Sequence, residues 1–173
     1  MHLRMMSLGK HWEPRTHSYE PARASHDGAA PPPLPASLTS LCQEALAAAQ
    51  AIPVQGACLP PLAPDVCLVN FYEKTGRLGM HQDKDESSDS LRRGLPVVSM
   101  SLGDAADFLF GSTCEESTAQ RVRLESGDVL VFGGPSRMVF HAVPNIYPGT
   151  APPSLVQATG LRPGRLNLTF RQT

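Results

Sequence analysis

The sequence predicts a mainly β protein of the α+β kind, a sandwich or barrel such as a jelly roll, supported by at least one helix. Short segments rich in β-branched and aromatic residues follow one another from residue 66 to residue 172, with Gly, Pro, Asp or Ser between them. Strands at such close spacing are typical of sandwiches and barrels. The segments are VCLVNFY, GLPVVSMSLG, ADFLFG, RVRLES, DVLVFGG, RMVFHAV and LNLTFRQ. With 173 residues, the chain is long enough for one domain with a buried core.

The first 36 residues differ in composition from the rest. They are rich in Pro, His and Arg, follow no regular period, and close on the run AAPPPLPAS. Consecutive prolines stop a helix, so this run marks a linker or an extended loop. The next run, SLTSLCQEALAAAQ, predicts a helix from Ser37, because a serine can cap it and its leucines recur at helical spacing. We therefore divide the chain into residues 1–36 and a domain over residues 37–173, and we expect NIYPGTAPPSLVQATGLRPG to be a surface loop.

Charge and cysteine content exclude several function classes. The chain carries 15 basic and 16 acidic residues, a formal charge of −1, which argues against indiscriminate binding to nucleic acid. No two of its four cysteines form a C-x-x-C pair, so zinc-finger and thioredoxin-like sites are excluded and reduced thiols are expected. No apolar run approaches the roughly 18 residues of a membrane helix, and no secretory leader opens the chain. We expect a soluble, intracellular monomer without membrane contact, in the cytoplasm or nucleus if the source is eukaryotic.

The motif HQD places an imidazole and a carboxylate, His81 and Asp83, on the same side of an extended backbone. Most other histidines lie in the first 36 residues, which leaves His141, in the run RMVFHAV, as the candidate for a third ligand. Strands that are distant in sequence become neighbours in a jelly roll, so this separation is compatible with one site. Two imidazoles and one carboxylate form the facial triad of non-haem Fe(II) oxygenases. A zinc site with the same ligands, or a polar loop, remains open at this point.

The last predicted strand, RLNLTFR, is apolar on one face and strongly polar on the other. The polar face is formed by Arg165, Asn167, Thr169 and Arg171. Asn70 and Tyr72 share a face of an earlier strand in the same way. The simpler alternative is a surface strand with its polar side in water. If both polar faces line a barrel, the buried arginines require an anion, and a dicarboxylate suits two guanidinium groups. This favours the iron oxygenases that consume 2-oxoglutarate over zinc hydrolases.

Three stretches, NFYEKTGRLGMHQDKDE, LESGDVLVFGGPSRMVFH and RLNLTFRQ, resemble the AlkB family of Fe(II)/2-oxoglutarate-dependent nucleic-acid dealkylases, in its bacterial type and its closest eukaryotic branch. The motifs N-x-Y, H-x-D, a distal His and R-x-N-x-x-x-R occur in the family's order. The resemblance implies a double-stranded β-helix that uses Fe(II), 2-oxoglutarate and O2. The implied iron ligands are His81, Asp83 and His141. The implied 2-oxoglutarate site consists of Arg165, Asn70 and Tyr72 at the distal carboxylate, Arg171 at the carboxylate beside the keto group, and Asn167 between them.

The resemblance also implies that the first 36 residues form a nucleotide-recognition lid, shorter than is usual in the family. Trp12 would stack on a flipped base, and Tyr19 would meet a backbone phosphate. Asp85 would contact the exocyclic amine of the base. Without the resemblance, Trp12 reads as an anchor between loop and core, and Asp85 as a solvated charge in the run DKDE.

The function expected from this resemblance is oxidative demethylation of N-alkylated bases in single-stranded or flipped-out DNA or RNA. A carboxylate at Asp85 favours cationic lesions such as 1-methyladenine and 3-methylcytosine, and the products would be formaldehyde, succinate and carbon dioxide. Three alternatives stay open. They are an N6-methyladenine or tRNA demethylase with the same chemistry, a 2-oxoglutarate oxygenase acting on another class of substrate, and a catalytically silent nucleic-acid-binding jelly roll.

Overall fold

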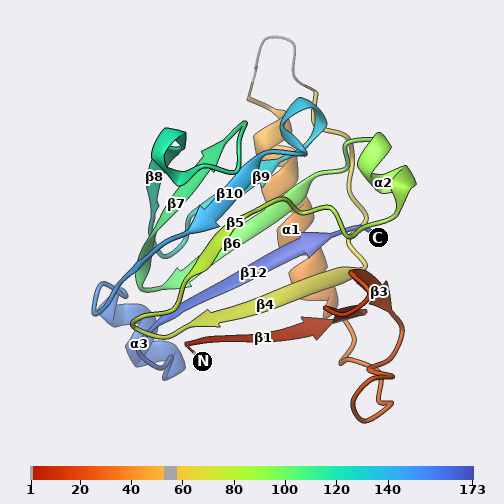
Figure 1. Cartoon of the computed structure of the whole chain (residues 1–173). Coiled ribbons are helices and arrows are strands. Elements are labelled where there is room, and N and C mark those ends of the chain that lie inside the picture. Colours follow the sequence, from red (N-terminus) through yellow and green to blue (C-terminus); the bar gives the residue numbers. More distant parts are fainter. Residues whose placement is uncertain (1, 53–57) are drawn as a thin grey trace.

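The computed structural model describes residues 2–52 and 58–173, which form two antiparallel sheets, a small hairpin and few helices (Figure 1). The larger sheet has the order β1-β4-β12-β6-β9. Its strands are β1 (Leu3–Leu8), β4 (Val66–Tyr72), β12 (Arg165–Arg171), β6 (Val97–Gly103) and β9 (Val129–Phe132). Every neighbouring pair is antiparallel, and the first and last strands of the expected jelly-roll region are therefore hydrogen-bonded to each other as β4 and β12.

The smaller sheet has the order β11-β7-β10-β5, with β8 paired to the other side of β7 along part of its length. Its strands are β5 (Leu78–His81), β7 (Ala105–Gly111), β8 (Gln120–Leu124), β10 (Phe140–Val143) and β11 (Ile146–Tyr147). A separate two-stranded hairpin is made of β2 (His11–Glu13) and β3 (Ser18–Glu20). The predicted mainly β fold of the jelly-roll type is confirmed.

The helix α1 (Ala36–Gln50) packs against one face of the larger sheet, as Figure 1 shows. Its buried residues, Cys42 and Leu46, contact a core that includes Val98 of β6 and Phe170 of β12. The helix predicted from Ser37 is thus present, and it is amphipathic because only one side meets the sheet. Two shorter helices are α2 (Ser88–Arg92) and α3 (Pro153–Thr159), and single 3-10 turns occupy Glu116–Thr118 and Gly134–Ser136.

Because α1 takes the apolar face of the larger sheet, the opposite face of that sheet is left to line the interior between the two sheets. Side chains alternate along a strand, so β12 sends Leu168 and Phe170 to the helix side and its polar residues to the other. The register sets Arg165 opposite Tyr72, and Asn167 opposite Asn70. The polar face of β12 is therefore buried rather than solvated.

The structure differs from the sequence-based description in two segments. Residues 1–36, described above as irregular, contain β1 and the β2–β3 hairpin. Strand β1 exists because it pairs with β4 from Leu3↔Tyr72 to Leu8↔Cys67, a tertiary contact that local sequence does not reveal. The expected loop before the last strand contains β11 and α3, with Pro at the start of the helix and Gly160 in the left-handed conformation at its end. No helix in the described part of the chain is long and apolar enough to cross a membrane.

Candidate active site

The three residues of the H-x-D…H pattern meet in the interior. His81 ends β5, Asp83 follows two residues later, and His141 lies in β10 directly opposite His81 in the antiparallel ladder. The two imidazole rings have their centroids 4.3 Å apart. One ligand atom from each of the three residues lies within 4.8 Å of the others. This arrangement fits a divalent metal ion held by two nitrogens and one oxygen.

The hydrogen bonds of the two imidazoles leave the same ring nitrogen available on each. The Nδ1 atom of His81 lies 2.8 Å from the carbonyl oxygen of Gly79, and Nδ1 of His141 lies 3.2 Å from that of Val139. Both Nε2 atoms face Asp83, at 3.6 Å from Oδ1 for His81 and 3.8 Å from Oδ2 for His141. Backbone carbonyls that accept from Nδ1 fix the tautomer in which Nε2 carries a lone pair for a metal.

Burial and charge favour the metal-binding protonation states. Burial by itself would raise the pKa of Asp83, but the nearby Arg171, followed by His141 and His81, lowers that pKa to about 2. Burial lowers the pKa of His141 despite the opposing effect of Asp83. At neutral pH the carboxyl is therefore ionised and the His141 imidazole is neutral.

A second part of the site lies deeper, where the two sheets enclose a cavity beside the triad. Its lining includes Asn70, Tyr72, Arg165 and Asn167, together with the triad itself. Arg165 is 1% exposed, and its Nη2 donates to Ser101 Oγ at 2.9 Å. Its Nε and Nη1 have no hydrogen-bond partner, and no carboxylate within the described residues forms an ion pair with it. A buried guanidinium with free donors fits the carboxylate of a bound dicarboxylate.

Arg171, at the other end of the polar face, has different surroundings. Its Nη2 lies 2.6 Å from Asp83 Oδ2, and its Nε lies 3.1 Å from Glu86 Oε1 without hydrogen-bond geometry. Its Nη1 donates to the hydroxyl of Tyr19 at 2.7 Å. Glu86 also pairs with the buried Arg137, at 2.9 Å. Arg171 therefore supports a ligand of the metal, and a contact with 2-oxoglutarate remains a prediction for it.

Glu86 and Arg137 are the members of this network that the sequence did not reveal. Glu86 looked like the end of a solvated acidic run, yet it is 7% exposed, and Arg137 is 3% exposed. The available signal was the spacing of Glu86, three residues after a metal-ligand candidate. The partner arginine lies about 50 residues further along, so only the fold pairs them.

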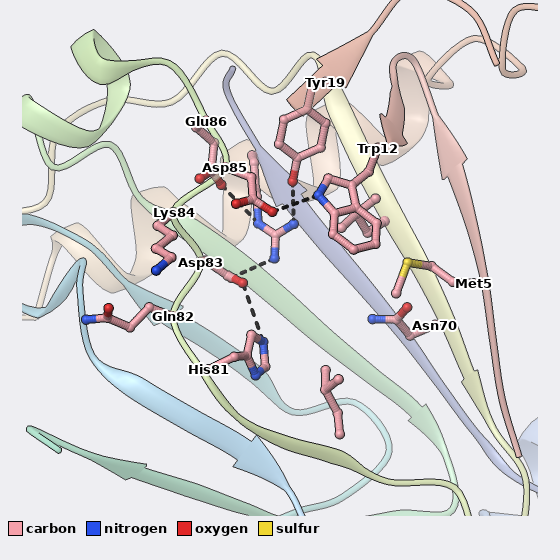
Figure 2. A pocket seen from close by; sticks show the side chains of 13 residues that line it. Met5, Trp12, Tyr19, Asn70, His81, Gln82, Asp83, Lys84, Asp85 and Glu86 are labelled. Atoms are coloured by element: carbon pink, nitrogen blue, oxygen red, sulfur yellow. Dashed lines mark hydrogen bonds and ion pairs between the residues drawn. The ribbon is translucent and has the colours of Figure 1, made fainter. Parts of the chain in front are cut away.

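The mouth of the site is formed by the β2–β3 hairpin and the segment after β5. Figure 2 shows Trp12 and Tyr19 pointing toward the loop that carries Asp83, Asp85 and Glu86. Trp12 Nε1 donates to Asp85 Oδ2 at 2.8 Å, and His17 Nδ1 lies 3.5 Å from the same oxygen. The structure thus brings the three predicted base-binding residues to one opening, where Asp85 bonds the indole rather than standing free in solvent.

Comparison with known proteins agrees with this geometry. The sequence model of the 2OG-Fe(II) oxygenase superfamily matches residues 1–171. The Arabidopsis thaliana protein named DNA N(6)-methyladenine demethylase ALKBH1C is 51% identical over 179 residues, which cover 99% of this chain and 39% of that protein. The Salmonella typhimurium alpha-ketoglutarate-dependent dioxygenase AlkB is 41% identical over 82% of this chain and 56% of its own length. A solved structure titled "The structure of OsALKBH1" superposes with a TM-score of 0.95 at 52% identity, covering all of this chain and 79% of that one.

The chain belongs to the AlkB family of 2OG-Fe(II) oxygenases. Membership confirms the metal and co-substrate expected from the sequence, Fe(II) and 2-oxoglutarate, with His81, Asp83 and His141 as the triad. The chain spans about two fifths of the length of the plant relative, 39%. Its own activity and substrate are therefore matters for proposal.

Proposed function

We propose that this AlkB-family chain oxidatively demethylates N6-methyladenine in DNA. The family resemblance of the sequence placed 1-methyladenine and 3-methylcytosine first and N6-methyladenine among the alternatives. The relatives that cover nearly the whole chain favour the alternative, since those at 51% and 48% identity are both named DNA N(6)-methyladenine demethylases.

The observation that carries the proposal is the pairing of two incomplete sites in one interior. The triad offers a face of three ligands, and the buried Arg165 beside it has two donor nitrogens without partners. Each site requires a group from outside the protein, and Fe(II) with 2-oxoglutarate satisfies both. When bound, Fe(II) supplies oxidation of an N-methyl carbon by O2 with conversion of 2-oxoglutarate to succinate and carbon dioxide, and the hydroxymethyl base then loses formaldehyde.

The chain's own residues would bind and orient. Arg165 would hold the distal carboxylate of 2-oxoglutarate, with Tyr72, whose ring lies 5.3 Å from the guanidinium carbon, limiting its motion. Asn70 and Asn167 would line the same pocket. Because these groups sit on hydrogen-bonded strands, the co-substrate is positioned by a rigid surface.

The mouth is suited to a flipped base. Trp12 would provide the stacking face, which offsets part of the cost of unstacking. The Asp85 carboxylate has two oxygens and several lone pairs, so it could accept from the N–H of N6-methyladenine while keeping its bond to Trp12. The side chain of His17 lies 3.5 Å from the same carboxylate, at the edge of the opening. Tyr19 would reach toward a phosphate only by leaving Arg171.

The test is formaldehyde release after anaerobic loading with Fe(II) and 2-oxoglutarate, followed by addition of air. Oligonucleotides with N6-methyladenine, 1-methyladenine and 3-methylcytosine are compared as DNA and as RNA. Most release is expected from N6-methyladenine DNA. It should be abolished by His141→Ala and by Arg165→Ala, and kept by the matched controls His2→Ala and Arg92→Ala, which alter exposed side chains.

The pattern of release separates the alternatives. Preference for 1-methyladenine would support the first substrate prediction. Preference for RNA would favour an activity like that named for the Schizosaccharomyces pombe protein tRNA demethylase abh1, which is 34% identical to this chain over 113 residues. Succinate formation without formaldehyde from any oligonucleotide would point to another substrate class. No turnover at all in a protein that binds Fe(II) would contradict the enzymatic proposal.

A further inference from the structure

A second cluster of metal-ligand side chains lies on the β2–β3 hairpin, away from the triad. His11, Glu13 and His26 each place one ligand atom within 4.8 Å of the others. His11 and Glu13 are alternate residues of β2, so both project from the face opposite to Trp12. Trp12 lines the mouth of the site, whereas His11 and Glu13 do not. The cluster is therefore on the back of the hairpin.

The cluster contains a buried carboxylate that lacks a strong cationic partner. Glu13 is 3% exposed, and it accepts hydrogen bonds from Ser25 Oγ and, at 3.0 Å, from the backbone N–H of Arg15. Among the described residues, His11 is the only basic side chain within ion-pair distance, at 3.8 Å from Nε2 to Oε2. The hydrogen bond from Ser25, followed by that from Arg15, lowers the pKa of Glu13, so the group is a carboxylate at neutral pH and can bind a cation.

A second, independent feature points to the same ligand. The His11 side chain is 13% exposed, and its Nε2 is buried without a hydrogen-bond partner. Buried ring nitrogens normally have one. The ring of His26 lies 5.9 Å from that of His11 at an interplanar angle of 77°, so the two imidazoles do not stack. An unpaired Nε2 beside a carboxylate and a second imidazole is a set of ligand atoms suited to a divalent metal ion.

The backbone holds His26 in place for this role. The amides of His26 and Gly28 both donate to the carbonyl of Arg23, at 2.9 and 3.0 Å, which closes a tight turn. The guanidinium of Arg23 also pairs with Asp27 at 2.8 Å. The turn therefore presents the histidine to the hairpin at little further entropic cost.

We propose that His11, Glu13 and His26 form a second divalent-metal site, of the zinc class, that ties residues 23–28 to the back of the β2–β3 hairpin. Two imidazoles and one carboxylate form a common zinc ligand set, with the fourth position left for water. Tetrahedral ligands at zinc–nitrogen distances of about 2.0 Å lie roughly 3.3 Å apart. His11 and Glu13 are already at 3.8 Å, so closure needs mainly a rotation of the exposed His26 side chain.

The proposed metal would act on the active-site mouth through position alone. It would fix β2 from behind, and the same strand carries Trp12 toward Asp85 in front. The site is not part of the iron chemistry, and the proposal does not depend on the proposed substrate.

The experiment uses the full chain with both triad imidazoles removed, His81→Ala/His141→Ala, so that zinc cannot bind there. After treatment with a chelator, Zn²⁺ is titrated while bound metal is measured and the fluorescence of Trp12, the single tryptophan, is recorded. One zinc per chain is expected, with a fluorescence change that saturates at one equivalent. Adding His26→Ala should weaken binding at least about 100-fold, because even loss of an outer partner costs 10- to 100-fold.

The matched control is His2→Ala, another exposed histidine of the first 36 residues. It should leave both the zinc stoichiometry and the fluorescence change intact. His26 is exposed on a turn, so its variant should keep the fold, and far-UV circular dichroism checks this for every protein. Absence of zinc from the triad-free protein, or zinc binding that His26→Ala leaves unchanged, would overturn the proposal.

Discussion

Replacing Arg165 with methionine should have opposite effects on stability and on co-substrate binding. Arg165 is 1% exposed and keeps one hydrogen bond, to Ser101, while two of its donors are unpaired. Burial lowers the pKa of Arg165, which is the expected sign when the charged form is disfavoured. Without 2-oxoglutarate, Arg165 therefore lowers the free energy of unfolding.

The magnitude follows from counting the unpaired donors. Each buried polar group left unsatisfied costs about 1–3 kcal/mol, so removing the unpaired donors should stabilise the protein. Loss of the hydrogen bond to Ser101 offsets about 1 kcal/mol of this stabilisation. For two unpaired donors, Arg165→Met should then stabilise the protein without co-substrate by about 1–5 kcal/mol. For a chain of this size, this corresponds to a rise in melting temperature of roughly 2–20 °C. The same change should weaken 2-oxoglutarate binding by about 2–5 kcal/mol, the usual loss when one partner of a buried charge pair is removed.

Arg171→Met is the matched comparison, because it alters the same residue type on the same face of β12. Arg171 pairs with Asp83 at 2.6 Å and lies 3.1 Å from Glu86. Its removal leaves the buried carboxylate of Asp83 without a guanidinium partner, whereas Glu86 keeps Arg137, and breaking such a buried pair typically costs about 3–5 kcal/mol. Thermal melting in a buffer without carboxylate, sulfate or phosphate measures stability, and calorimetry measures binding of 2-oxoglutarate.

The reasoning would be refuted if both variants lost stability to a similar extent in the absence of co-substrate. That result would mean that Arg165 has a partner in the ligand-free protein and that the pocket does not await an anion. Unchanged affinity for 2-oxoglutarate in Arg165→Met would contradict the assignment of that residue directly.

Further predictions concern the core, the thiols and the mouth. Leu46→Ala on the buried side of α1 should cost about 2–5 kcal/mol in denaturant unfolding, whereas Leu41→Ala on the exposed side should cost far less. Burial raises the pKa of two of the four thiols to about 12, so that at pH 8 only about one in 10,000 of each is ionised. A thiol reagent should therefore titrate two groups in the folded protein and four after denaturation. The buried thiols are Cys42 and Cys67, and the exposed thiols are Cys58 and Cys114. Asp85→Asn keeps an acceptor for Trp12 but removes the charge, so kcat/KM should fall by about tenfold for cationic 1-methyladenine and less for neutral N6-methyladenine.

The sequence predicted those parts of the molecule that follow from local periodicity. Alternation along RLNLTFR placed Arg165 and Asn167 on one face, and the burial of both agrees. The placement of His81 and Asp83 on the same side was likewise predicted from their spacing on an extended backbone. The distal histidine, His141, could be chosen by elimination. Strand β1 was missed because it forms by pairing with β4, a tertiary contact that no local pattern encodes.

Charge pairing was harder to predict than strand position. The run DKDE read as a solvated loop, although its last residue, Glu86, lies buried between Arg137 and Arg171. Identical residue types also took different roles. Two arginines on one face of β12 looked equivalent in sequence, but one end of the strand meets buried carboxylates and the other does not. That difference arises from where the segment after β5 runs in space.

The contrast between the two arginines explains how one strand, β12, can support both a metal ligand and the proposed co-substrate pocket. Arg171 grips Oδ2 of Asp83 at 2.6 Å, while Oδ1 lies nearer to His81, at 3.6 Å. A guanidinium held in turn by Glu86 therefore fixes the carboxylate before any metal arrives, which lowers the reorganisation that binding requires. Arg165 has the opposite task. If Arg165 binds 2-oxoglutarate as proposed, it must stay unpaired until the dicarboxylate enters, because a protein carboxylate in that place would compete with the co-substrate. The regular alternation of β12 allows both, since it turns both guanidinium groups to the interior, one at each end of the strand.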